Sequence, residues 1–212
     1  MSFLPPNFGQ LPPEESDYAT SRFVILPVPF ERTTSYGKGT ANGPAAIVRA
    51  SQSMELYDEE LGAEIAAHGI ATLPPFLPES FGMEAAIAEI RAEARTHIAA
   101  GKRLLVLGGE HSLTLGPVRA AADLHGEIGV VQFDAHADLR EEYEGTPYSH
   151  ASVMRRVVED GHPTLAIGIR SLSRPEADFA RERRLDIVWG HELAAFGPEA
   201  LAARLERLPE RI

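Results

Sequence analysis

The chain has 212 residues, of which 44% are hydrophobic and 24% charged, a composition typical of a globular protein that can bury a core. It contains no cysteine, which excludes disulfide frameworks and thiolate metal sites, so any metal must be held by histidine, carboxylate or backbone oxygen. The net charge of −11 argues against a nucleic acid partner, because phosphate binding requires a basic surface. It is compatible with a cationic substrate, but the charge alone favours a simpler explanation, an acidic surface that keeps the protein soluble.

The sequence also carries no recognisable targeting signal. Its first residues, MSFLPPNFGQ, lack the basic start and apolar centre of a secretory signal. No apolar run approaches the roughly 18 residues that a membrane span requires. We therefore expect a cytoplasmic protein without a membrane span, and its length predicts one domain over residues 1–212.

Strand-like and helix-like segments alternate along the chain, which predicts an α/β fold with a mainly parallel sheet covered by helices. The six expected strands cover residues 22–30, 70–73, 103–107, 128–133, 165–169 and 186–189. Expected helices begin near Pro44, after His111 and after His150, and cover Met83–Ala100 and Pro198–Leu208.

The longest expected helix, Met83–Ala100, has an apolar stripe at helical spacing. The stripe consists of Ile87, Ile90, Ala94 and Ile98. The neighbouring His97 has no ligand-type residue at useful spacing, and we expect it at the surface or capping the helix.

The segment Phe133–Asp138, FDAHAD, directly follows the fourth expected strand. Asp134, His136 and Asp138 alternate with alanines, so a straight strand would place all three on one side, spread over about 13 Å. They can share a site only if the chain bends as it leaves the sheet, at the end of a parallel strand where α/β folds bind ligands. Because carboxylates with imidazole suit Mn²⁺, Zn²⁺ or Fe²⁺, the segment predicts a metal site.

A second segment, Leu107–Pro117, LGGEHSLTLGP, follows the third expected strand. Gly108 and Gly109 permit a tight exit from the sheet, and His111 stands at the start of the next helix. By itself this segment suits a glycine turn with a capping Ser112, or an anion site at a helix N-terminus, as well as it suits a metal ligand. Because Phe133–Asp138 already offers possible metal ligands at the end of another strand, we expect His111 to be a further ligand.

Two loops contain further candidate residues. The segment Tyr36–Pro44, YGKGTANGP, fails the phosphate-loop spacing because Arg32 occupies the place of the first glycine, so we expect it to shape the rim of a site. His150, in PYSHASVMRR, stands just ahead of a helix, and its spacing alone favours a capping or exposed histidine.

The segments GGEHS, FDAHADLR, YSHASVMRR and AIGIRS, in this order, resemble the ureohydrolase family of arginases and agmatinases, and most closely its agmatinase-type branch. The resemblance extends from about Phe23 to the end of the chain. It implies a three-layer αβα sandwich with a mainly parallel sheet, in which two Mn²⁺ ions hold a hydroxide that attacks a guanidinium carbon and releases urea. It also implies a small cationic guanidino substrate and a homo-oligomer.

The resemblance also assigns roles to single residues. It implies that His111, Asp134 and Asp138 bind the first ion. Asp134 would bridge to the second ion, which His136 also binds. His150 matches the histidine proposed to shuttle protons near the leaving amine, which reverses the interpretation from its spacing. Imidazole suits this role because it exchanges protons near neutral pH.

The chain departs from the family pattern in two places. Arginases have an asparagine two residues after the last aspartate of FDAHAD, where this chain has Arg140, so we expect an agmatine-like substrate rather than arginine. A later family strand with an Asp-x-Asp pair has no counterpart before Ile212. We therefore expect a C-terminally truncated chain, with an incomplete metal site and a gap in the sheet between the third and fourth strands.

The leading prediction is a manganese-dependent amidinohydrolase that acts on a linear guanidino compound. The alternative is a non-catalytic ureohydrolase-like protein that binds at most one ion weakly or only supports an oligomer. A two-metal hydrolase of phosphoesters is a third interpretation, which the charge of −11 and the lack of a phosphate cradle disfavour.

Overall fold

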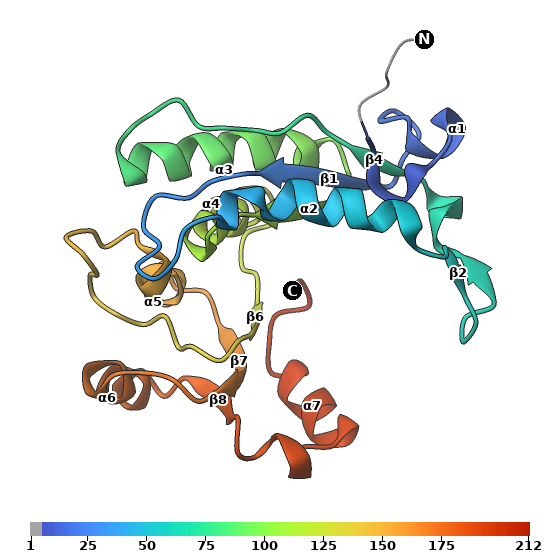
Figure 1. Cartoon of the computed structure of the whole chain (residues 1–212). Helices are drawn as coiled ribbons and strands as arrows, with labels where there is room; N and C mark the ends of the chain where they lie inside the picture. The colour runs from blue at the N-terminus through green and yellow to red at the C-terminus, as the bar shows by residue number, and fades with distance from the viewer. Residues whose placement is uncertain (1–5) are drawn as a thin grey trace.

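The computed structural model describes residues 6–212 (Figure 1). It contains two three-stranded sheets, in the orders β4-β1-β5 and β6-β7-β8, and every strand pair within them is parallel. The α/β class with mainly parallel sheets is thus confirmed. The strands are β1 (Phe23–Val28), β4 (Ile70–Thr72), β5 (Arg103–Gly108), β6 (Val130–Phe133), β7 (Thr164–Ile169) and β8 (Asp186–Trp189).

One β-structure was not predicted. The short strands β2 (Tyr57–Asp58) and β3 (Ala63–Glu64) pair antiparallel as a small hairpin. Strands of two residues are too short to show the alternation of apolar and polar residues on which strand prediction depends.

Seven α-helices connect and cover the strands within the described part of the chain. They are α1 (Pro13–Ser16), α2 (Gly43–Ala50), α3 (Met83–Ala99), α4 (Leu115–His125), α5 (Val153–Glu159), α6 (Arg174–Arg183) and α7 (Pro198–Leu205). Among residues 6–212, no helix has the length and apolar character needed to cross a membrane.

The first sheet is covered on both faces. Leu26 and Val28 of β1 pack on one face with Ile90 of α3 in a buried apolar cluster. On the other face, Pro27 of β1 and Val48 of α2 line a common pocket. These alternating side chains follow the period of two that a strand imposes, so the helices form layers above and below the sheet.

The second sheet has the same layering. Ala166 of β7 packs with Val157 of α5 and Phe179 of α6. The adjacent Leu165 points to the opposite face, where it packs with Leu201 of α7. Both sheets therefore have the three-layer αβα arrangement that the family resemblance implies.

The apolar stripe of α3 is confirmed except in its last turn. Ile87 and Ile90 are buried as predicted. In the last turn, however, the prediction was wrong: His97 is buried and Ile98 is only half buried. The His97 Nδ1 atom lies 2.9 Å from the hydroxyl of Tyr18, so a hydrogen bond to the N-terminal segment satisfies the buried imidazole.

The two sheets are separate, because no described strand pairs with the outer edge of β5 or of β6. Leu105 of β5 is 46% exposed and Phe133 of β6 is 75% exposed. Helix α4 lies between the two halves, since Leu115 belongs to the core of the second half while α4 packs against α3 of the first. The interruption lies where the resemblance placed a gap, whereas truncation of the chain stays a prediction.

Candidate metal centre

The FDAHAD segment bends as it leaves β6. The side chain of Asp134 accepts a hydrogen bond from the backbone N–H of His136 at 2.8 Å, which closes a tight turn directly after the strand. Asp138 has a φ of 51°, a left-handed conformation that aspartate tolerates better than most residues. The bend therefore replaces the straight strand that would have kept these side chains apart.

The neighbouring strand end holds this bend in place. The N–H of Ala137 donates to the carbonyl of Ser171 at 3.1 Å, and the N–H of Ser171 donates to the carbonyl of Ala135 at 2.9 Å. Both bonds join the FDAHAD segment to the residues that follow β7. The bend is thus determined by the sheet and not by the segment alone.

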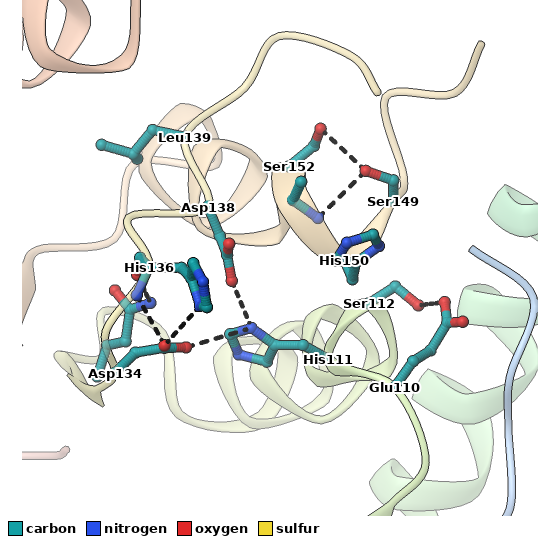
Figure 2. A network of polar contacts seen from close by, with 12 residues as sticks. Glu110, His111, Ser112, Asp134, His136, Asp138, Leu139, Ser149, His150 and Ser152 are labelled. Atoms are coloured by element: carbon teal, nitrogen blue, oxygen red, sulfur yellow. Dashed lines mark hydrogen bonds and ion pairs between the residues drawn. The ribbon is translucent and has the colours of Figure 1, made fainter. Parts of the chain in front are cut away.

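The bend brings Asp134 and Asp138 to His111, which begins the turn after β5. The His111 Nδ1 atom lies 2.7 Å from Asp138 Oδ2 and 3.9 Å from Asp134 Oδ2 (Figure 2). One ligand atom from each of the three side chains lies within 4.8 Å of the others. This set of one imidazole and two carboxylates fits a divalent metal ion such as Mn²⁺, Zn²⁺ or Fe²⁺.

His136 lies on the other side of Asp134 and not within this triad. Its Nδ1 atom is 3.4 Å from Asp134 Oδ1, and its side chain is 64% exposed. Figure 2 shows Asp134 between the two imidazoles, with one carboxylate oxygen towards His111 and the other towards His136. A carboxylate in this position has the geometry to be shared by two ions.

A cleft of about 560 Å³ joins these four residues to His150. His150 begins the turn before α5, and its ring meets the ring of Tyr143 edge to face, with 5.6 Å between centroids. Tyr36 of the glycine-rich loop also lines this cleft, as we expected of a rim loop. The structure thus brings all five candidate residues to one cavity.

Two buried carboxylates next to the cleft were not predicted. Glu176 is 4% exposed, and it accepts the backbone N–H of Leu139, the residue after Asp138, at 3.0 Å. It also caps α6 through the N–H and hydroxyl of Ser173, both at 2.7 Å. The spacing of Ser173 and Glu176 is that of a capping box, a signal that was readable in the sequence.

The second is Glu110, which is 4% exposed and precedes His111. Its carboxylate accepts the backbone N–H groups of Arg32 and Thr33, each at 2.6 Å. Its place within GGEHS marked it as part of a motif, but no local pattern linked it to Thr33, which lies 77 residues earlier.

Comparisons with known proteins relate the chain to one family. Residues 21–211 match the model of the arginase family. The chain is 40% identical to the N(1)-aminopropylagmatine ureohydrolase of Synechocystis sp. over 84% of its own length and 60% of that protein. It is 38% identical to the protein of the same name from Thermus thermophilus (strain ATCC BAA-163), over 97% of its own length and 69% of that protein.

A solved structure of a related protein has the same fold. The agmatine ureohydrolase of Thermoplasma volcanium superimposes with a TM-score of 0.86 at 29% identity, over 99% of this chain and 70% of that one. The chain thus spans between about 60% and 70% of the length of these relatives. The resemblance noted in the sequence is confirmed, and the chain belongs to the arginase family.

Proposed function

We propose that this protein hydrolyses the guanidino group of a linear guanidino compound to urea and an amine. The observation that carries the proposal is the meeting of His111, Asp134 and Asp138 at the adjoining ends of β5 and β6, with His136 and His150 in the same cleft. The names of the relatives support it, since ureohydrolases release urea.

We assign the four donors to two divalent ions, with Mn²⁺ as the metal. His111 and Asp138 would hold the first ion, His136 the second, and Asp134 both. Bound divalent ions lower the pKa of a coordinated water molecule towards neutrality and orient it for attack. The residues of the chain hold the donors in place, because Gln132 donates a hydrogen bond to the carbonyl of His136 at 3.1 Å and Glu176 holds the backbone beside Asp138.

The proposed substrates are agmatine and longer amines derived from it, such as N(1)-aminopropylagmatine. Relatives at 38–40% identity are named for N(1)-aminopropylagmatine, and a structural neighbour for agmatine. The guanidinium of Arg140 lies 4.9 Å from the ring centroid of Tyr143, and its Nε atom lies 3.9 Å from Glu176. This cation is therefore engaged with the wall of the cleft. The net charge of −11 is compatible with a cationic substrate.

A second candidate is a non-catalytic protein with an incomplete metal site. The observation that favours it is the interruption of the sheet between β5 and β6. Among the described residues, the candidate metal ligands beside this interruption leave the side chain of His136 largely exposed. Such a protein would bind at most one ion weakly. The homo-oligomer and the cytoplasmic location expected from the sequence also stay predictions.

The test combines metal binding with urea release. Calorimetric titration of the purified chain with Mn²⁺ should show binding that Asp134→Asn weakens. With Mn²⁺ present, urea release from agmatine and N(1)-aminopropylagmatine should fall about 100-fold in Asp134→Asn, because the shared ligand is lost. Asp178→Asn, on the exposed face of α6, is the matched control and should change neither result.

The outcomes separate the two candidates. Urea release that persists unchanged in Asp134→Asn would refute the proposed roles. Mn²⁺ binding without urea release from either compound would favour the non-catalytic protein.

A further inference from the structure

The hydroxyl of Thr33 joins two groups that are distant in the sequence. It donates a hydrogen bond to Glu110 Oε1 at 2.7 Å. The same oxygen lies 3.0 Å from the backbone nitrogen of His150 and 3.2 Å from His150 Nδ1. Thr33 is 8% exposed, so these contacts are protected from competing water.

The carboxylate of Glu110 is fixed from several directions. Its Oε2 atom accepts the backbone N–H groups of Arg32 and Thr33. Its Oε1 atom accepts the hydroxyls of Thr33 and Ser112, the latter drawn in Figure 2. Because the group is buried and its oxygens are occupied, Glu110 holds the Thr33 hydroxyl in one orientation.

The direction of these bonds determines where the imidazole carries its proton. A hydroxyl has one hydrogen and two lone pairs, and the hydrogen of Thr33 is committed to Glu110. At His150 the oxygen can therefore only accept, once from the backbone N–H and once from Nδ1. Nδ1 must then carry a hydrogen in the neutral ring as well as in the charged one.

We infer that Glu110 and Thr33 are positioning residues that hold His150 in the Nδ1–H tautomer, with Nε2 as the atom that gains and loses a proton in the cleft. Nε2 has no hydrogen-bond partner among residues 6–212, and the ring lines the cleft with the metal-type donors. The edge-to-face contact with Tyr143 supports the ring from another side.

The catalytic part of this inference rests on the proposed function. In that reaction Nε2 takes up a proton released by the attacking water and passes it to the amine nitrogen as the C–N bond breaks, while Nδ1 keeps its hydrogen bond to Thr33 throughout. A ring with its proton on Nε2 would instead present a donor to the cleft in its neutral form, and could not accept a proton there.

The tautomer can be measured without metal or substrate. Two-bond ¹H–¹⁵N correlation spectra of the labelled chain at alkaline pH, assigned with His150→Gln, distinguish the two forms. We expect His150 as Nδ1–H, although a free histidine side chain favours Nε2–H in water. Thr33→Val should return it to Nε2–H, whereas Thr33→Ser, which keeps the hydroxyl, should not.

Two results would overturn the assignment: an Nε2–H tautomer in the unaltered chain, or an unchanged tautomer in Thr33→Val. The measurement on the unaltered chain decides the matter even where Thr33→Val does not fold. If Thr33 acted only as the acceptor for the backbone N–H of His150, Thr33→Val would lower stability without moving the ring proton.

Urea release gives the second readout. Thr33→Val should lower kcat by about 10- to 100-fold with little change in KM, and Thr33→Ser should restore most of it. A tautomer that changes while kcat does not would overturn the role in proton transfer. Absence of urea release from the unaltered chain would count against the proposed function, while the spectra would still decide the tautomer.

Discussion

At the scale of single residues, Gly109 determines how closely two strand ends approach. A Cβ atom at this position would lie 1.9 Å from the carbonyl oxygen of Phe30, an impossible contact with rigid backbone. The next N–H, that of Glu110, donates to the same carbonyl at 2.9 Å. This close approach allows Glu110 to reach Thr33. It thereby helps to position His111, which follows Glu110, and His150, which contacts Thr33.

We expect Gly109→Ala to destabilise the fold by about 3 kcal/mol or more, because the exits of β1 and β5 would have to separate. Urea denaturation followed by circular dichroism measures the change. Gly82→Ala is the control, since nothing lies within 4 Å of its added Cβ, and it should shift stability by less than about 1 kcal/mol. Equal effects of the two substitutions would contradict this explanation.

At the scale of elements, Glu31 anchors the rim loop between β1 and α2. Its carboxylate accepts the backbone N–H groups of Gly39 at 2.9 Å and Ala41 at 3.0 Å, and the hydroxyl of Thr34 at 3.2 Å. The bonds from Ala41 and Gly39, in that order, lower the pKa of Glu31 below its ordinary value of 4.5. The carboxylate of Glu31 thus joins the two sides of the loop that carries Tyr36 to the cleft.

The lowered pKa sets the pH dependence of the rim loop. Since the folded pKa lies below 4.5, the carboxylate stabilises the closed loop above pH 4.5 and loses this effect as the pH falls through the folded pKa. Hydrogen-exchange protection factors at Gly39 and Ala41 should therefore be high at neutral pH and fall in acid.

Glu31→Gln provides the comparison for this pH dependence. The variant should show lower protection at neutral pH and no acid transition of its own, because it cannot ionise. Equal protection of Gly39 and Ala41 in both proteins at neutral pH would show that other contacts hold the loop.

At the scale of the whole molecule, the cleft lies across the interruption between the two sheets. His111 comes from the half that contains β5, and Asp134 and Asp138 come from the half that contains β6. The buried cluster that contains Ile87 of α3 and Leu115 of α4 joins the two halves. Whether residues 1–212 form one domain stays a prediction.

The open edges of β5 and β6 should make the chain associate with itself, because unpaired strands with exposed apolar side chains pair with other chains. We expect sedimentation velocity to show larger species as concentration rises. The double substitution Leu105→Lys with Phe133→Lys should suppress them, since it places charges at both edges. Leu61→Lys, which changes a 77% exposed leucine in the β2–β3 turn, should not suppress them. A monomeric unaltered chain over the whole range would contradict the prediction.

The sequence by itself predicted the six strands of the two parallel sheets, five of the seven helices of the described chain and the chemistry of the candidate site. The strand segments were readable because buried parallel strands are apolar along their length, and Ile87 and Ile90 because a helix repeats every 3.6 residues. The donors of FDAHAD were readable because histidine and carboxylates follow directly after a buried strand. These signals lie within a few consecutive residues, so no knowledge of the fold is needed to recognise them.

Only the tertiary structure decided which groups meet. The bend that joins Asp134 to Asp138 depends on hydrogen bonds to the exit of β7, and the contact of Thr33 with His150 spans 117 residues. His97 is buried because Tyr18, 79 residues away, reaches its ring. Such contacts arise from the packing of distant strand ends, which leaves no periodic signal in the sequence. The sequence therefore named the candidate metal ligands, and the packed sheets determined their geometry and which residues contact His150.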